Sequence, residues 1–411
     1  MIPPRTLAIL GGRLVDTAGG TLRDGGVLVR DRRIAAVGTF EVPADADRID
    51  ARGALIAPGI VDLGSFAIDL PAFTAGGITR AALMPDQSPP LDEAALVQRA
   101  AAAGKPDVWI HPIAAATRAL DGLELAEIGL MQAAGACAVA TGRRWIADSG
   151  MMHRLLSYAS ALDLLVIVHA EDCGLTGDAV ATAGETSTRL GLPAAPAIAE
   201  ALAVARDLAL AEESGARLHF HQLTTARSFD LVRAAKARGV RVSCGISPAH
   251  LLLSDQAIGP FRTFARLSPP LRDERDRKAA LAAVADGTVD VLCSAHDPQG
   301  PEAKRLPFAD AAPGMAGAET LLALSLILVR DGLIDLPRLF TLLSATPARL
   351  LGVPGGGIAI GDEADLILVD ADAPWRIESE RMAASEGNTP FDGLPVQGKV
   401  LKTIKGGQPI G

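Results

Sequence analysis

The feature that most restricts the fold of this chain is a regular alternation of strand-like and helix-like segments through its central part. Short apolar runs typical of strands lie near residues 59–63, 79–84, 107–111, 136–140, 164–169, 217–221, 240–244 and 289–294. Helix-like stretches lie between or after them, at 91–104, 121–134, 151–163, 195–214, 226–238, 273–286 and 316–331. This alternation indicates parallel βα units, and eight such units predict a closed (β/α)8 barrel. An open doubly wound sheet is the alternative, but the sequence lacks a glycine-rich dinucleotide fingerprint after the first strand.

Both ends of the chain contain short apolar runs separated by glycine-rich turns, which is typical of antiparallel β structure. Turns such as Gly11-Gly12 and Gly25-Gly26 mark the N-terminal part, and Gly355-Gly356-Gly357 marks the C-terminal part. Each part alone would leave an apolar face exposed, so we predict that the two pair into one composite β-sandwich domain. The predicted boundaries are 1–56 and 353–411 for the two parts of the sandwich and 57–352 for the barrel.

Composition and charge exclude several classes of partner. The chain has 411 residues, of which 49% are hydrophobic and 21% charged, as in globular proteins with a substantial core. A net charge of −9 argues against a nucleic acid or an anionic membrane as the main partner. No uncharged run approaches membrane-spanning length, and the N-terminal residues do not resemble a signal peptide, so we expect a cytoplasmic protein. Four scattered cysteines, Cys137, Cys173, Cys244 and Cys293, are expected to be reduced and packed.

The carboxyl ends of the predicted strands are the places to look for chemistry, because catalytic groups of βα barrels project there. The fifth strand ends in His169, followed by Glu171 and Asp172, and the sixth ends in His221. His219 lies two residues earlier and therefore on the same face, where we expect it to pack deeper in the barrel. The first strand, by contrast, ends in Gly64-Ser65-Phe66, which offers no strong metal ligand.

Five motifs together resemble the signatures of the dihydroorotase family of the amidohydrolase superfamily. In the family's order they are Ala75-Gly76-Gly77-Ile78-Thr79 with Met84-Pro85, His169-Ala170-Glu171-Asp172, His221-Gln222-Leu223-Thr224-Thr225, Ser268-Pro269-Pro270-Leu271-Arg272 and Gly314-Met315-Ala316-Gly317-Ala318-Glu319-Thr320. The resemblance extends from about residue 7 to 405. It implies a distorted (β/α)8 TIM-like barrel with a composite β domain, and a metal-assisted hydrolysis of cyclic amides.

Most metal-binding positions that the resemblance implies are substituted in this chain. The two histidines of the first strand correspond to Gly64 and Phe66, the bridging group after the fourth strand to Thr141, and the catalytic aspartate after the eighth strand to Ala295. No lysine lies between Lys105 and Lys236, which excludes a carbamylated lysine as the bridging group. Only His169 and His221 remain, whereas a catalytic zinc generally has three protein ligands. We therefore expect no resident cofactor, with zinc at a residual His169–His221 site as the alternative.

The positions implied to hold the substrate or the base also differ from the family. Ile68 replaces an arginine, Asp86 and Ser268 replace asparagines, and Gln299 replaces a histidine. Asp297 is a substitute candidate for the base, in a shifted pair with His296. A shift of two residues moves a side chain several Å, however, and catalysis needs tighter placement. The two remaining histidines could still form a metal site with Glu171, Asp172 or Asp297, or be hydrogen-bonded remnants in the barrel mouth.

The other histidines and one charge cluster carry less functional weight. His111 ends the third strand and is expected to be structural, and His153 and His250 are expected at the surface. The cluster from Arg272 to Lys278 is expected to be a solvated helix start with local ion pairs.

Three functional hypotheses follow from the resemblance and its departures. The first is a non-catalytic dihydroorotase homologue that supports aspartate carbamoyltransferase as a structural subunit of pyrimidine biosynthesis, within a homo- or hetero-oligomer. The second is a metal-dependent amidohydrolase of dihydroorotate, a hydantoin or allantoin that uses a reduced site at His169 and His221. The third is a ligand-binding module whose barrel mouth senses a pyrimidine intermediate.

Overall fold

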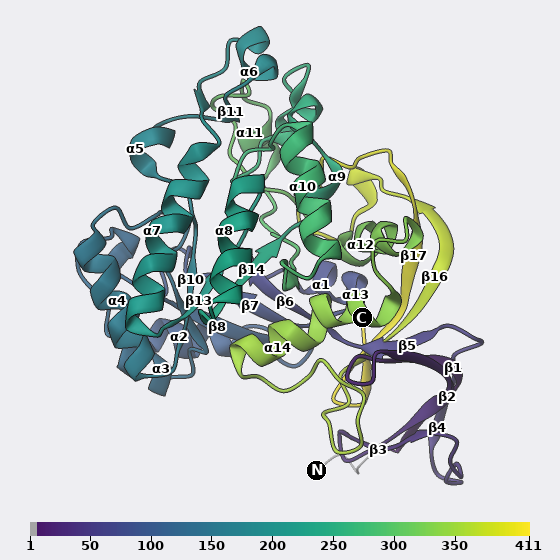
Figure 1. Ribbon diagram of the computed structural model, residues 1–411. Coiled ribbons are helices and arrows are strands. Elements are labelled where there is room, and N and C mark those ends of the chain that lie inside the picture. Colours follow the sequence, from purple (N-terminus) through teal and green to yellow (C-terminus); the bar gives the residue numbers. More distant parts are fainter. Residues whose placement is uncertain (1–5) are drawn as a thin grey trace.

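Strands from both ends of the chain form one continuous sheet in the computed structural model, which describes residues 6–411 (Figure 1). They are β1 (Leu7–Asp16), β2 (Thr21–Arg30), β3 (Arg33–Gly38), β4 (Asp47–Asp50), β5 (Leu55–Pro58), β16 (Leu366–Arg376), β17 (Pro395–Lys405) and β18 (Gln408–Ile410). The order is β18-β17-β16-β5-β1-β2-β3, with β4 paired to β1. The two chain ends meet where β16 lies antiparallel to β5, with Leu366 opposite Pro58. This arrangement confirms the composite β domain. The domain boundaries stay a prediction, because a single residue separates β5 from the first barrel strand.

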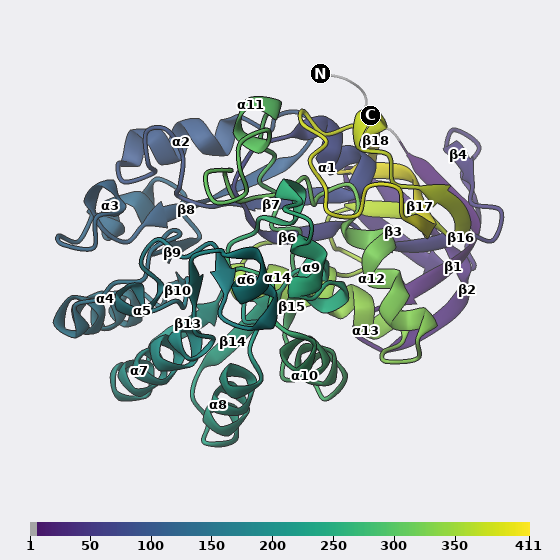
Figure 2. The same ribbon diagram turned by 90° about the horizontal axis from the view of Figure 1, so that it is seen from above.

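The central strands form a second sheet, parallel throughout, that curls into a nearly closed barrel (Figure 2). They are β6 (Ile60–Ser65), β7 (Ile78–Leu83), β8 (Trp109–Ala115), β9 (Ala138–Ala140), β10 (Leu165–Val168), β13 (Arg217–Phe220), β14 (Val242–Ile246) and β15 (Val291–Leu292). Neighbours pair in the order β15-β14-β13-β10-β9-β8-β7-β6. The eight predicted strands are all present, which confirms the barrel and excludes the open doubly wound sheet.

Helices surround the barrel, as Figure 2 shows for α4, α7, α8 and α10. The helices that follow the barrel strands include α1 (Leu70–Gly76), α2 (Ala94–Ala102), α3 (Ile128–Ala133), α4 (Ser149–Ala161), α7 (Ile198–Ser214), α8 (Ala226–Ala237), α10 (Glu274–Ala285) and α12 (Leu321–Arg330). Shorter helices lie between these elements or follow α12. They are α5 (Cys173–Thr176), α6 (Glu185–Leu190), α9 (Pro248–Leu252), α11 (Pro301–Lys304), α13 (Leu336–Phe340) and α14 (Thr346–Leu351). Among the described residues, no helix is both long and apolar enough to cross a bilayer.

Successive side chains of each barrel strand point to opposite faces and therefore pack in two different apolar cores. On β6, Val61 and Leu63 belong to the cluster inside the barrel, whereas Ile60 packs in the larger cluster between strands and helices. Alanines such as Ala82, Ala138 and Ala140 fill part of the interior. Small side chains therefore occupy the narrow space inside the barrel, in keeping with the 3% aromatic content.

Buried hydrogen bonds close the gap between the first and last barrel strands. Asp62 on β6 accepts a hydrogen bond from the Ser294 backbone N–H at 2.8 Å and another from the Ser294 hydroxyl. Burial raises the pKa of Asp62, and the two bonds from Ser294 act against that rise. Just beyond, the Phe66 N–H donates to the His296 carbonyl at 2.8 Å. These contacts place the end of β6 directly beside the loop that follows β15.

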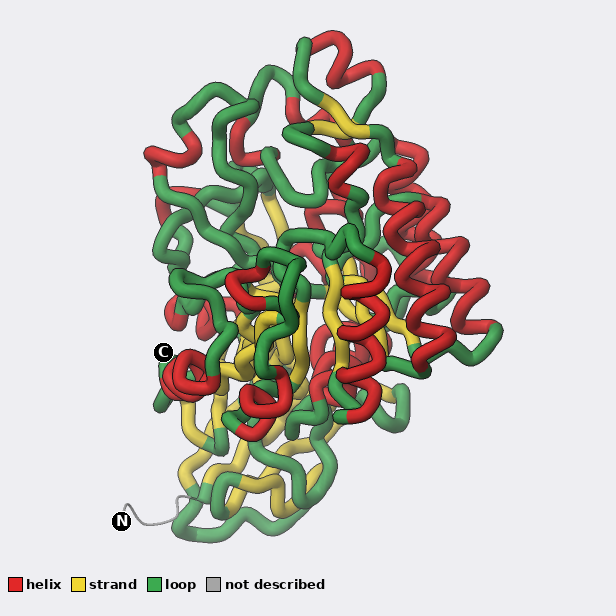
Figure 3. Tube along the Cα trace, turned by 90° about the vertical axis from the view of Figure 1, so that its left-hand side faces the viewer, coloured by secondary structure: helices red, strands yellow, loops and turns green. Residues whose placement is uncertain are grey.

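An ion-pair cluster joins the barrel to the composite sheet, which lies below the barrel in Figure 3. The buried Arg80 on β7 lies 2.7 Å from Asp365 and also pairs with Glu363. Its guanidinium lies over the Trp109 ring at 5.3 Å. His111 Nε2 lies 3.3 Å from Arg80 Nη1, and burial together with the Arg80 charge lowers the pKa of His111 to about 4. His111 is therefore a structural group in the interface with the sheet.

Candidate functional site

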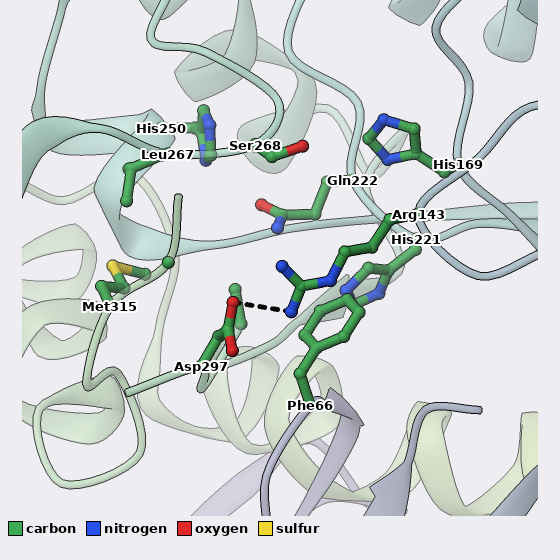
Figure 4. A pocket seen from close by; sticks show the side chains of 12 residues that line it. Phe66, Arg143, His169, His221, Gln222, His250, Leu267, Ser268, Asp297 and Met315 are labelled. Carbon is green, nitrogen blue, oxygen red and sulfur yellow. Dashed lines mark hydrogen bonds and ion pairs between the residues drawn. The ribbon is translucent and has the colours of Figure 1, made fainter. Parts of the chain in front are cut away.

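The side chains singled out at the strand ends converge on one small cavity in the barrel mouth (Figure 4). Its volume is about 30 Å³, far below the 300–1,000 Å³ of typical ligand pockets. It is lined by Phe66, Arg143, His169, His221, Gln222, His250, Leu267, Ser268, Ala295, Asp297, Gly314 and Met315. The barrel centre is therefore filled by protein side chains.

The side chain of His221 occupies the space beside Gly64 that a ligand-bearing residue would need. Gly64 has a φ of +111°, and a Cβ built there would lie 2.0 Å from His221 Cε1 and 2.6 Å from Nδ1. Both the backbone angle and the contact require glycine at this position. A histidine at residue 64 and the present His221 rotamer are therefore mutually exclusive.

His221 is buried, and neither ring nitrogen has a hydrogen-bond partner among residues 6–411. The residue is 4% exposed, and its ring meets Phe66 edge-on with centroids 5.7 Å apart. Burial and the nearby His169 and Arg143 lower the pKa of His221 to about 3. The imidazole is thus neutral and packed against Phe66.

His169 is tied to a buried ion-pair network on the other side of the cavity. Its Nε2 lies 3.1 Å from Glu171 Oε2, and Glu171 Oε1 accepts from Arg272 at 2.8 Å. Against the effect of burial, the His169 hydrogen bond and the Arg272 charge lower the pKa of Glu171 to about 2. Arg272 also reaches Glu200 at 3.4 Å and donates to Thr224 at 2.8 Å. Sequence reasoning placed Arg272 in a solvated helix start, which is wrong: this network buries it.

Arg143 is a central residue of the site that sequence reasoning missed. Its guanidinium lies 4.0 Å from the Phe66 ring centroid and pairs with Asp297 at 2.6 Å, as the dashed line in Figure 4 marks. Its backbone N–H donates to Asp86 at 2.9 Å. Arg143 follows the fourth strand directly after Thr141-Gly142, so the rule that strand ends carry functional groups applied to it as well.

His296 and Asp297 diverge instead of forming a pair. His296 Nε2 lies 3.5 Å from Asp69 Oδ2, and its ring meets Phe73 with centroids 5.6 Å apart. Asp297 turns the opposite way, toward Arg143, and accepts a hydrogen bond from Gln299 at 2.8 Å. Asp297 therefore neutralises the Arg143 cation and does not pair with His296.

The other positions that the family resemblance assigns to substrate binding lie at different places around the small cavity. Ser268 lines the cavity, and Ile68 packs against the core outside the barrel. Burial raises the pKa of Asp86, whose Oδ1 accepts the Arg143 N–H. None of these side chains adds a cation that faces a substrate carboxylate in the centre.

The donor set does not fit a catalytic metal. In the part of the chain that the structure describes, no three His, Cys, Asp or Glu side chains gather in a geometry that would hold an ion. Of the donors at the cavity, His169 is bound to Glu171, His221 packs against Phe66, and Asp297 is paired with Arg143. The Arg143 guanidinium also places a positive charge beside the two imidazoles, where it would repel a second cation.

His250 and Cys173 also differ from expectation. His250, predicted at the surface, is 5% exposed: its Nδ1 contacts the Ser247 hydroxyl and its Nε2 the Pro269 carbonyl, each at 2.9 Å. Cys173, predicted to be packed, is exposed. His219 lies inside the barrel as expected, with Nδ1 2.8 Å from the Ser243 hydroxyl. The partly exposed His153 pairs with Glu213, and Glu274 pairs locally with Arg277.

The buried neutral histidines predict a loss of stability in mild acid. Burial lowers the pKa of His250 to about 4, whereas an unfolded histidine titrates near 6.5. Between these values the unfolded chain binds the extra proton, so this contribution to stability is intact above pH 6.5 and falls as the pH drops toward 4. When the pH is lowered from 7 to 5, the free energy of unfolding of His250→Gln is expected to fall by roughly 2 kcal/mol less than that of wild type. Urea unfolding at both pH values measures this; equal losses would contradict it.

Comparisons with known proteins agree with the fold and with the strand-end motifs. Residues 76–410 match the Amidohydrolase family. A protein named dihydroorotase from Syntrophotalea carbinolica is 38% identical over 98% of both chains, and one of the same name from Citrifermentans bemidjiense is 35% identical over 98% of this chain and 99% of its own. Among solved structures, an L-hydantoinase (dihydropyrimidinase) from Arthrobacter aurescens superposes with a TM-score of 0.87 at 24% identity, over 98% of this chain and 95% of the other. The last similarity concerns the fold.

Proposed function

This chain belongs to the amidohydrolase family, and we propose that it is a dihydroorotase-like protein of pyrimidine biosynthesis that has lost hydrolysis and serves as a structural subunit for aspartate carbamoyltransferase. The observation that carries the proposal is the repacked centre. His221 fills the space beside Gly64, and Phe66 and the Arg143–Asp297 pair fill the space in front of it. Whole-length identity of 35–38% to proteins named dihydroorotase supports the pyrimidine branch of the family.

Loss of catalysis follows from what metal-assisted hydrolysis of an amide requires. The reaction needs a cation with an open coordination position, a bound water whose pKa is pulled toward neutrality, and a base for its proton. Here position 295 is alanine, and the nearby Asp297 is held by Arg143 and Gln299. Asp297, the substitute candidate, therefore lacks the freedom that a general base requires.

A structural role accounts for a chain that retains its fold while the centre is filled. The barrel, the composite sheet and the buried Glu171–Arg272–Glu200 network are all intact. Such a framework presents a rigid surface to a partner without any need for an open site. The carbamoyltransferase is the partner that the family resemblance suggests, in a hetero-oligomer.

Metal content tests the catalytic half of the proposal. Elemental analysis of the full chain, purified without chelators or affinity-tag metal, is expected to find zinc far below one atom per chain. His169→Ala is expected to leave this value unchanged, and added zinc is expected to shift the melting temperature of neither wild type nor variant, because His169 bonds to Glu171 and not to a metal. Ring opening of dihydroorotate is expected to stay at background with zinc present. Near-stoichiometric zinc that His169→Ala removes would contradict the proposal.

Complex formation tests the structural half. The full chain, mixed with aspartate carbamoyltransferase from the same organism, is expected to co-elute with it on size exclusion and to raise its activity. His169→Ala is expected to preserve both effects, since the His169 side chain is largely enclosed and bonded to Glu171. The absence of a complex would refute the structural role while leaving the metal result standing.

The hydrolase alternative rests on the two imidazoles that remain. His169 and His221 line the same cavity, and the relatives named dihydroorotase support an activity on cyclic amides. Metal-dependent opening of dihydroorotate or a hydantoin, abolished in His169→Ala, would favour this second function.

A further inference from the structure

A second cavity lies beside the filled centre and is large enough for a small molecule. Its volume is about 630 Å³, within the 300–1,000 Å³ of typical ligand pockets. It is bounded by the loops after β8, β9 and β10 and by the segment around residues 266–270, and it shares Arg143, His169 and Ser268 with the small cavity. The open space of the barrel mouth has thus moved outward from the centre.

The carboxylates around this cavity are engaged with their own surroundings. Asp121 accepts the Leu123 backbone N–H, and Asp148 caps α4 by accepting from Met151. Glu171 is held between His169 and Arg272. In the described chain no ion pair joins these acids to Arg144 or Arg266, although the Glu171 charge still acts on Arg266.

Two arginines of the cavity have no carboxylate partner. Within residues 6–411, no carboxylate lies within 4.0 Å of Arg144 or Arg266, whereas Arg143 is paired with Asp297. The Nε of Arg266 is buried and has no hydrogen-bond partner among the described residues. The Arg266 backbone is fixed, because its carbonyl accepts from the Gly314 N–H at 3.1 Å. The Arg266 side chain is partly buried, and its Nη1 donates to the Leu267 carbonyl at 3.4 Å, so its hydrogen-bonding capacity is only partly used.

We propose that this cavity binds a small organic anion, whose carboxylate or phosphate group pairs with Arg266 and Arg144. A guanidinium presents parallel N–H donors that match either group in a bidentate geometry. Binding requires neither a metal nor the repacked centre, so it is compatible with a non-catalytic barrel. It also places the ligand-binding hypothesis on two arginines that are not among the substituted positions Ile68, Asp86, Ser268 and Gln299, although Ser268 lines the cavity too.

Calorimetric titration of the full chain tests the site with two separate probes, N-carbamoyl-L-aspartate for the carboxylate class and inorganic phosphate for the phosphate class. At least one is expected to saturate at one molecule per chain. Arg266→Gln is expected to weaken that binding at least tenfold, and Arg144→Gln to weaken it severalfold. Arg227→Gln is the matched control, because Arg227 is exposed on α8 and is not among the residues that line the cavity. Arg144 is exposed, so its variant reports binding without a folding defect.

Cys173 provides a second readout within the unmodified protein. It is exposed and lines this cavity, whereas Cys244 and Cys293 are buried and Cys137 is partly buried. A bound probe is expected to slow alkylation of Cys173 severalfold in wild type and in Arg227→Gln, but not in Arg266→Gln. Failure of both probes to saturate, or wild-type binding in both Arg266→Gln and Arg144→Gln, would overturn the proposal. Neither result depends on the carbamoyltransferase, so the structural role is tested separately.

Discussion

Replacing Gly64 by alanine is expected to lower the free energy of unfolding by about 3 kcal/mol or more. Two effects add at this position. The backbone φ of +111° is strained for any residue with a Cβ, and that Cβ would lie 2.0 Å from His221 Cε1. Ordinary carbon contacts need about 3.5–4.0 Å, so the His221 ring or the end of β6 must move. The midpoint of urea unfolding, followed by circular dichroism, measures the loss.

Two further variants separate backbone strain from the steric clash. Gly135 has a φ of +108° and nothing within 4 Å of a built Cβ, so Gly135→Ala carries the strain alone. It is expected to cost about 1–2 kcal/mol. Gly64→Ala combined with His221→Ala removes the clashing ring and is expected to cost clearly less than the sum of the two single variants. A loss for Gly64→Ala equal to that for Gly135→Ala, or strict additivity with His221→Ala, would show that the ring does not fill this space.

The same contact explains why single substitutions are not expected to rebuild a metal centre. A histidine introduced at residue 64 competes with His221 for one volume, and Phe66 and Arg143 occupy the adjacent space. The side chains around Gly64 pack against one another, with the Arg143 guanidinium over the Phe66 ring and paired with Asp297. Recovery of a metal site therefore requires the His221 rotamer, Phe66, and the Arg143–Asp297 pair to change together with Gly64.

The fold was predictable because it rests on local patterns. Alternating strand and helix segments predicted the barrel, and the period of two along a strand placed His219 in its interior. These signals depend only on residues close in sequence. The packing of short strands then follows from the handedness and closure rules of βα units.

The site was less predictable because long-range contacts decide it. Arg272 stands in a run of charges that reads as a solvated helix start, yet Glu171 and Glu200, far apart in sequence, form a buried network with it. His250 lies in a short helical turn whose burial depends on the Pro269 segment. For Arg143, a long side chain at a strand end, sequence position fixes the Cα but not where the guanidinium lies.

The buried Arg80 predicts an equally large effect at the other end of the barrel. Arg80→Met is expected to lower the free energy of unfolding by about 3–5 kcal/mol, because it leaves Asp365 and Glu363 without their cation. Asp365 is 2% exposed, and burial already raises its pKa despite the Arg80 charge. The urea midpoint measures the loss, and tryptophan fluorescence adds a local readout because Arg80 lies over Trp109.

The matched control is Arg32→Met, since Arg32 also lies over the Trp109 ring, at 5.9 Å, but is exposed and has no carboxylate partner in the described chain. Its expected cost is at most about 1 kcal/mol. If the stranded charge causes the loss in Arg80→Met, then adding Asp365→Asn recovers part of it, because the amide keeps an acceptor for the Gly406 N–H and removes the charge. Equal losses in the two arginine variants would mean that stacking on Trp109, and not the ion pair, holds the barrel to the composite sheet.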